Sequence, residues 1–172
     1  MRSRLAPISA NPLATSHEDT TTAKAVTELL EKDRIVARIT QLFIATDARD
    51  WPGVRECFAE SVHFDMTSMA GGKPATLTPA QIAAGWEEGL RAVHAIHHQA
   101  GNFRVQLRGD GATAFCYAIA MHYRKTASGR NTRTFVGSYD YALRRQSGDW
   151  RITSFRFTLK FLDGNLDLEH DG

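Results

Sequence analysis

The chain has 172 residues, of which 42% are hydrophobic and 23% charged, and its formal net charge is +2. This length suits one well-buried domain and is too short for two domains of ordinary size. No apolar run approaches the roughly 18 residues of a membrane span, and so small a positive excess does not favour a nucleic-acid partner. Because Cys57 and Cys116 have no CxxC spacing and the N-terminus has no continuous apolar segment, we expect a cytoplasmic protein.

The first part of the chain predicts a tail followed by a helix. Residues 1–22 are rich in Ser, Thr, Ala and Pro and are expected to be a flexible tail. From 24 to 48, apolar residues recur at helical spacing, which predicts a long amphipathic helix that could be interrupted near Lys32 and Asp33. We therefore expect a single domain over 23–165, with a C-terminal tail at 166–172.

Two further helices, a strand and a loop come next. Asp50 is suited to cap a short helix that has Pro52 in its first turn and ends around Phe58. The strand VHFDM follows, and then TSMAGGKPATL predicts a flexible loop because of its glycines and proline. Thr78, with Gln81 three residues later, has the capping-box pattern that begins the third helix.

After the third helix the apolar period changes from about 3.6 to 2. The alternating runs are separated by GDG, ASGRN and SGD, short connections that are typical of antiparallel neighbours. These runs predict four strands, at 95–108, 112–126, 133–145 and 150–162. Helices followed by a strand meander predict an α+β domain, in which a curved antiparallel sheet packs on three N-terminal helices.

The run GATAFCYAIAMHYRK has two faces of unequal size. The small face ends at His122, and the other face carries large apolar side chains. The small face consists of Ala114, Cys116, Ala118 and Ala120, and the bulky face of Phe115, Tyr117, Ile119, Met121 and Tyr123. We expect the small face to line a hollow that reaches His122, and the bulky face to bind further copies of the chain in a homodimer or homotrimer.

A carboxylate and a histidine are expected to meet in this hollow. Asp47 lies one helical turn after Phe43, so it should point into the core and need a hydrogen-bonding or cationic partner there. The stretch AIHHQAGN offers two histidines, but adjacent strand residues face opposite sides, so only one of them can enter. Simple parity leaves the choice between His97 and His98 open, because a bulge at Gly101 would reverse the alternation.

Four strings, FIATDARDWPGVRECFAESVHFDM, HHQAGN, AMHYRK and DWRITSFRF, occur in this order along the chain. Together with the order of the elements they resemble the nuclear transport factor 2 superfamily, specifically its SnoaL-like and scytalone dehydratase-like branch, over residues 33 to 162. The resemblance implies a cone-shaped α+β fold and a catalytic set of Asp47, His98 and His122. It thus favours His98 over His97 as the inward residue.

The chain departs from scytalone dehydratases at the residues that polarise the substrate. Thr46 and Met66 stand at the positions of their two tyrosine donors, and Tyr139 stands at the position of a pocket Asn. The resemblance therefore implies that Tyr139 or another hydroxyl supplies the electrophilic group. Asn102 and Asp65 complete the candidate substrate-binding residues.

Elimination or isomerisation next to a carbonyl needs a base, a group that holds the base in one tautomer, and a proton donor. We expect Asp47 to accept from one nitrogen of His98, whose other nitrogen removes a proton from the substrate. His122 or a hydroxyl would protonate the leaving oxygen. The prediction is a lyase or isomerase, without metal or organic cofactor, that acts on a small cyclic or polyketide-like hydroxy-carbonyl compound.

Other interpretations of the sequence compete with this one. The main alternative is a non-catalytic ligand-binding module, or a structural subunit similar to the β-subunit of ring-hydroxylating dioxygenases. Epoxide hydrolysis would need an Asp/Arg/Asp set that we cannot place. His94, His97 and His98 could suggest a metal site, but the change from helix to strand between them breaks the facing geometry. A cluster of four basic residues around one hairpin indicates a solvated edge: Arg124, Lys125, Arg130 and Arg133.

Overall fold

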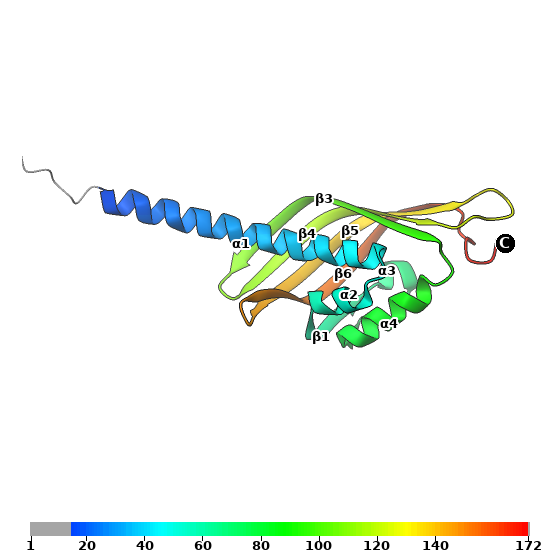
Figure 1. Cartoon of the computed structure of the whole chain (residues 1–172), viewed down its shortest axis with the longest axis horizontal. Coiled ribbons are helices and arrows are strands. Elements are labelled where there is room, and N and C mark those ends of the chain that lie inside the picture. The colour runs from blue at the N-terminus through cyan, green and yellow to red at the C-terminus, as the bar shows by residue number, and fades with distance from the viewer. Residues whose placement is uncertain (1–14, 172) are drawn as a thin grey trace, which may run out of the picture.

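Helix α1, Thr15–Asp47, is one continuous helix in the computed structural model, which describes residues 15–171 (Figure 1). It runs through Lys32 and Asp33 without a break, so the interruption that the sequence allowed there does not occur. It begins within the segment 1–22 for which a tail was expected, and residues 1–14 lie outside the described residues. Among residues 15–171, no helix combines the length and the hydrophobicity that crossing a bilayer requires.

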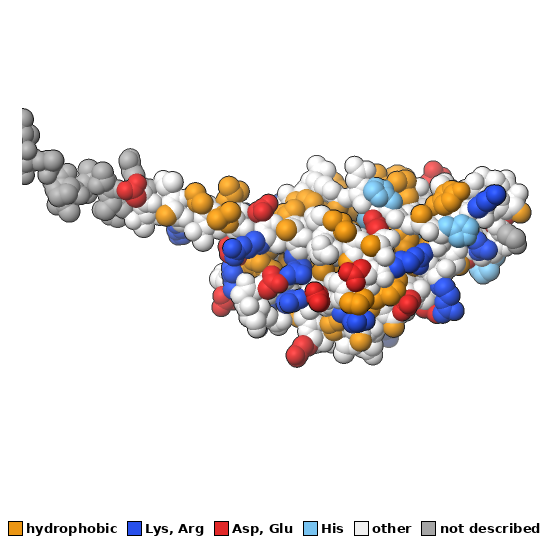
Figure 2. All heavy atoms as spheres, viewed as in Figure 1, with side chains coloured by type: hydrophobic (Ala, Val, Ile, Leu, Met, Phe, Trp, Pro, Cys, Tyr) orange, Lys and Arg blue, Asp and Glu red, His pale blue; other side chains and the backbone are white. Residues whose placement is uncertain are grey.

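The two halves of α1 have different surroundings. The first half extends beyond the sheet (Figure 1), and Figure 2 shows hydrophobic side chains along it. Val26, Leu29 and Leu30 are at least half exposed in this part. The second half packs on the sheet through residues such as Ile39 and Leu42, which are fully buried because the helical spacing places them on one face.

The elements between α1 and the meander are short. Helix α2, Trp51–Cys57, begins at the expected cap, where Asp50 Oδ1 accepts from the Gly53 N–H at 3.0 Å. Strand β1, Phe58–Asp65, follows directly. The segment expected to be a loop contains a one-turn helix, α3 (Thr67–Ala70), and a three-residue strand, β2 (Ala75–Leu77). Helix α4, Pro79–Gly89, starts with the predicted capping box of Thr78 and Gln81.

The four strands of the predicted meander are present as β3 (Ala95–Arg108), β4 (Gly111–Tyr123), β5 (Thr132–Gln146) and β6 (Asp149–Gly164). The sheet order is β2-β1-β6-β5-β4-β3, so β3 lies at one edge. Neighbouring strands of the sheet pair antiparallel, except β1 and β6, which pair parallel. The expectation of a wholly antiparallel sheet is therefore wrong for β1 and β6. No hairpin connects these two strands, so nothing requires them to run in opposite directions.

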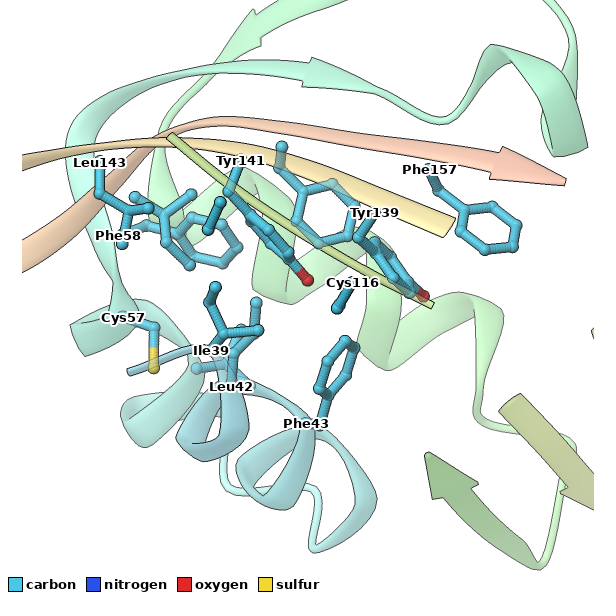
Figure 3. Close-up of a cluster of buried hydrophobic side chains, with 14 of the residues drawn as sticks. Ile39, Leu42, Phe43, Cys57, Phe58, Cys116, Tyr139, Tyr141, Leu143 and Phe157 are labelled. Carbon is cyan, nitrogen blue, oxygen red and sulfur yellow. The ribbon is translucent and has the colours of Figure 1, made fainter. Parts of the chain in front are cut away.

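The domain is of the α+β class, and its main core lies between the inner face of the curved sheet and the helices. Figure 3 shows Tyr139 and Tyr141 extending from β5 toward α1, which contributes Leu42 and Phe43 to the same cluster. The small face of β4 is also in this cluster, and its members Ala114, Cys116, Ala118 and Ala120 are at most 7% exposed. The small side chains thus let α1 and the aromatic rings of β5 approach the sheet closely.

Candidate active site

Asp47 and His98 are in direct contact. Asp47 Oδ1 lies 2.6 Å from His98 Nδ1, and Asp47 Oδ2 accepts from the backbone N–H of His98 at 2.9 Å. This second bond is possible because β3 is an edge strand, whose outer N–H groups have no strand partner. One carboxylate thus holds both the ring and the backbone of the same residue, which restricts the imidazole to one orientation.

A bulge in β3 decides which histidine faces inward. The pairing of β3 with β4 shifts between Gly101 and Arg104, and Asn102 in between has a φ of 56°. His98 pairs with the buried Ala120 and lies on the inner face of the sheet. Phe103, beyond the bulge, lies on the same face although one residue number is even and the other odd, because the bulge reverses the alternation. The side chain of His97 is 63% exposed, and its Nδ1 lies 3.9 Å from Asp47 Oδ2.

The end of α1 is fixed relative to the start of β3 by Arg49. Arg49 has a φ of 56°, which ends the helix just after Asp47. Its guanidinium donates to the carbonyl oxygens of Leu90 and Val93 at 2.9 and 2.6 Å, within the connection from α4 to β3. The carboxylate and the imidazole are therefore presented to each other by two backbone segments that are tied together beside them.

The contact prepares His98 to act as a base. A carboxylate accepts hydrogen bonds, so the ring proton is placed on Nδ1 and the lone pair on Nε2. Phe43 stacks on the imidazole with ring centres 5.1 Å apart and supports its orientation. The side chains of His98 and Asp47 are 11% and 22% exposed, so the pair is partly covered and still reachable from solvent.

His122 lies on the same face of the sheet as His98. His98 pairs with Ala120, which places His122 two residues further along β4 and diagonally across from His98. Burial lowers the pKa of His122 to about 4, and the nearby Arg133 guanidinium acts in the same direction. His122 is therefore neutral at pH 7 and offers a hydrogen bond there instead of an acidic imidazolium proton.

Arg133 is partly enclosed, which contradicts the expectation that it belongs to a solvated edge. Its side chain is 13% exposed and forms a two-point ion pair with Glu169, in which Nη1 and Oε2 are 2.8 Å apart. Glu169 belongs to the C-terminal segment, where Leu168 is fully buried in a small cluster with residues such as Val93 and Ile96. Sequence reasoning placed Arg133 at a solvated edge and did not single out Glu169.

Of the expected electrophilic groups, Tyr139 is the one that contacts the residues around His98. It is 5% exposed, and its ring meets Phe43 edge to face at 5.2 Å. Burial raises its pKa well above the usual range, so its hydroxyl stays protonated. Thr46 is also buried, but its hydroxyl donates to the Leu42 carbonyl within α1 at 2.8 Å. Met66 is half-buried against the core and precedes α3.

Asp65 and Asn102 lie away from the Asp47 and His98 contact. Asp65 Oδ1 accepts from the backbone N–H and hydroxyl of Thr67 at 3.0 and 2.7 Å, and these bonds lower its pKa. Asn102 is exposed at the bulge and lines an open surface hollow of about 330 Å³. That hollow also contains Tyr117 and Lys160, which shows that Asn102 faces the outer side of the sheet.

The hollow expected above the small face of β4 is occupied in large part by side chains. A larger open hollow of about 620 Å³ lies elsewhere, between β1 and the β3–β4 turn, and includes Glu60 and Arg108. Among residues 15–171 no group of three or more His, Cys, Asp or Glu side chains has a metal-binding arrangement.

Tyr141 is a buried polar residue that sequence reasoning did not single out. Within the described part of the chain its hydroxyl is buried without a hydrogen-bond partner, and Figure 3 shows it beside Tyr139. A buried donor without a partner costs about 1–3 kcal/mol. Tyr141 pairs with Ala114 and Tyr139 pairs with Cys116, so both lie on the inner face of β5. The alternation of residues along the strand could have predicted this position from the sequence.

Tyr141→Phe is expected to raise the free energy of unfolding by about 1 kcal/mol, because it removes the unpaired hydroxyl and keeps the ring. Urea unfolding of the wild type and the variant measures this change. Tyr123→Phe, at a tyrosine that is 42% exposed, is the matched control and should leave stability unchanged. A loss of stability in Tyr141→Phe would mean that the hydroxyl does have a partner in solution.

The fold and the sequence are similar to those of known proteins. The model of the SnoaL-like domain matches residues 27–156, and no curated protein sequence matches the chain significantly. A candidate aromatic ring hydroxylase from Novosphingobium aromaticivorans is 26% identical, with 82% of this chain and 97% of that chain covered and a TM-score of 0.69. A candidate scytalone dehydratase from the same organism is 14% identical, with coverages of 82% and 91% and a TM-score of 0.72. A hexachlorocyclohexane dehydrochlorinase is 12% identical, with coverages of 83% and 94% and a TM-score of 0.69. Because the family model covers more than half of its length, the chain belongs to the SnoaL-like domain family.

Proposed function

We propose that the protein is a cofactor-independent lyase or isomerase, dehydratase-like or cyclase-like, that acts on a small cyclic or polyketide-like hydroxy-carbonyl compound. The observation that carries the proposal is the contact between Asp47 and His98, in which one carboxylate holds both Nδ1 and the backbone N–H of the histidine. This arrangement leaves Nε2 of His98 free to remove a proton from carbon. It is a general base with its orienting group in place.

The residues of this site can both remove the proton and return it to the leaving group in the proposed elimination. His98 Nε2 takes the proton next to the substrate carbonyl, the C–H electrons form the new double bond, and the carbon–oxygen bond breaks. Asp47 stabilises the imidazolium that results, and the proton on Nε2 then passes to the leaving oxygen, so that water departs. The neutral donors His122 and Tyr139 are the groups available to stabilise negative charge on the carbonyl oxygen.

The names of two structural neighbours support elimination as the reaction class. A dehydratase removes water and a dehydrochlorinase removes HCl, so both names describe eliminations. The two differ in the leaving group, whereas the hydrogen on the neighbouring carbon has to be removed in both. The base and its carboxylate are therefore the elements that a shared fold can supply to different substrates.

A panel of cyclic β-hydroxy ketones and hexachlorocyclohexane tests this function. Conjugated ketone formation is followed by ultraviolet absorbance, and chloride release is followed with an ion electrode. We expect turnover of at least one compound by the wild type, its loss in Asp47→Asn, and its retention in His97→Ala, the exposed neighbour that serves as matched control. Turnover that is unaffected by Asp47→Asn would overturn the proposed mechanism.

A non-catalytic subunit is the second candidate, and one comparison favours it. The neighbour with 26% identity is named as a candidate aromatic ring hydroxylase, and the sequence resemblance also suggested a structural subunit similar to the β-subunit of ring-hydroxylating dioxygenases. In that case the compounds of the panel would bind without conversion. Binding measured by calorimetry, together with the absence of any product, would support this second candidate over the first.

The proposed partner of the outer sheet face is a second or third copy of the chain, and the proposed location is the cytoplasm. The face carries exposed apolar side chains from β4 and β6, namely Tyr117, Ile119, Met121, Tyr123 and Phe161. Exposed apolar areas of this kind are common at protein interfaces. Sedimentation velocity should show a dimer or trimer that dissociates in Ile119→Lys. Leu166→Lys, outside this face, is the control, and a monomeric wild type would overturn the proposal.

A further inference from the structure

A chain of polar contacts leads from the C-terminal segment to His122. Glu169 is paired with Arg133 at two points, and Arg133 Nη2 lies 3.4 Å from Nδ1 of His122. His122 also packs against Phe135, with ring centres 5.0 Å apart, and Arg133 lies over the same ring. The imidazole is therefore held between an aromatic ring and a guanidinium that is itself held by a carboxylate.

The chemistry of the guanidinium decides which nitrogen of His122 carries the proton. Arginine has donors and no acceptor, so Nδ1 of His122 must accept from Nη2 if the two are to form a hydrogen bond. A neutral imidazole has one proton, and this proton is then on Nε2. His98 is in the opposite situation, because a carboxylate at its Nδ1 requires the proton to be there.

We infer that Arg133 and Glu169 are positioning residues that hold His122 in the tautomer with Nε2–H, so that the site presents His98 Nε2 as an acceptor and His122 Nε2–H as a donor. The inference deepens the proposed function and rests on it for its catalytic meaning. Two identical side chains on one sheet face take opposite roles because their Nδ1 atoms meet groups of opposite charge.

The charges around His122 agree with this assignment. Arg133 on β5 and His98 on β3 disfavour a proton on its second nitrogen, whereas Glu169 of the C-terminal segment and Asp47 on α1 favour it. The Glu169 carboxylate is paired with Arg133 and offsets part of the positive charge of the guanidinium. Nδ1 of His122 is still within reach as an acceptor for Arg133 Nη2. His122 remains a neutral donor, and a cationic second imidazole beside Arg133 is avoided.

An acceptor on His98 and a donor on His122 together define the class of substrate. A compound that fits needs an acidic C–H for His98 and, a few bonds away, an oxygen that accepts from His122. A ketone or enone with its α-hydrogen in reach has both groups, and the neutral donor would bind its oxygen more strongly as negative charge develops. A hydrocarbon or simple alkyl halide has no such oxygen and would leave the His122 N–H without a partner.

The C-terminal segment is part of this arrangement. Arg124 donates to the backbone carbonyl of Glu169, and Leu168 is fully buried against Leu90, Val93 and Ile96. These contacts fix the backbone on which Glu169 is carried. The segment after the last strand therefore holds the Glu169 carboxylate in place beside Arg133.

Nitrogen-detected NMR of the ¹⁵N-labelled full-length protein at pH 7 tests the inference without any substrate. His122 is assigned by the loss of its signals in His122→Asn. In the wild type we expect a protonated nitrogen at Nε2 and an unprotonated one at Nδ1. In Arg133→Met the pKa of His122 should rise by about one pH unit or more and the preference for one tautomer should be lost. In Glu169→Gln the pKa should fall.

Two matched variants control for loss of charge alone. Arg108→Met and Glu87→Gln remove an exposed cation and an exposed carboxylate and should leave the tautomer of His122 unchanged. A wild-type His122 with its proton on Nδ1 would overturn the inference, even if Arg133→Met does not fold. Because no turnover is measured, the inference can fail while the elimination stands, and the panel of substrates can fail while the tautomer is as expected.

Discussion

Replacing His98 with alanine is expected to lower the turnover number by about 10²- to 10⁴-fold on any compound that the wild type converts, because it removes the proposed general base. The fold should survive, since the histidine lies at the sheet edge with its side chain partly exposed. The turnover number is measured on the compound identified in the substrate panel. Circular dichroism and a thermal melt of the variant check that the loss is not one of folding.

Asp47→Asn separates the two functions of the carboxylate. An Asn at this position can still accept from the His98 backbone N–H, but its amide group cannot stabilise an imidazolium as a charged carboxylate does. We therefore expect a large loss of turnover with little change in stability. His97→Ala is the neighbouring control, and comparable losses in His97→Ala and His98→Ala would show that His98 is not the base.

Acidification is expected to destabilise the protein through His122. Its pKa falls from an ordinary value of 6.5 to about 4 in the folded state, mainly because the ring is buried and also because Arg133 is near. Between these two values the unfolded chain binds a proton at His122 that the folded chain does not bind, so stability falls as the pH falls through this window. A difference of this size corresponds to a loss on the order of 3 kcal/mol, and the stability is fully present above pH 6.5.

The contribution of His122 is isolated by comparing two proteins. The free energy of unfolding in urea is measured from pH 7 to pH 4 for the wild type and for His122→Asn, whose amide oxygen can still accept from Arg133. The difference between the two curves should shrink or change sign as the pH falls, because the variant has no proton to take up at this position. His63→Asn, at an exposed histidine, controls for the substitution itself. Parallel curves for the wild type and His122→Asn would contradict the expectation.

The secondary structure and the first half of the site were accessible from local sequence. Amphipathic spacing predicted α1, the caps at Asp50 and Thr78 predicted the starts of α2 and α4, and the alternation after residue 94 predicted four strands. The resemblance to scytalone dehydratases pointed to Asp47 and His98, which the structure places in contact. These features depend on short stretches of chain, in which side-chain type and spacing decide the conformation.

The choice between His97 and His98 could not be made from the spacing of residues. It depends on whether β3 contains a bulge, and the bulge at Gly101–Arg104 is visible only in the pairing with β4. The direction of β1 relative to β6 is similar, because these strands are far apart in the chain and no turn between them fixes their orientation. Asn102 and Asp65 were candidates from their residue types, and the register of their strands places them away from the Asp47 and His98 contact.

By itself, the amino-acid sequence determined which segments are helices and strands, which residues are capable of acid–base chemistry, and the resemblance to a family. Only the tertiary structure decided that Arg133 leaves the solvated edge, meets Glu169 from the far end of the chain, and reaches His122. The physical reason is that an ion pair between distant residues leaves no local pattern, because it depends on where two backbone segments come to lie. Local periodicity specifies the elements, whereas register and packing specify which polar side chains meet.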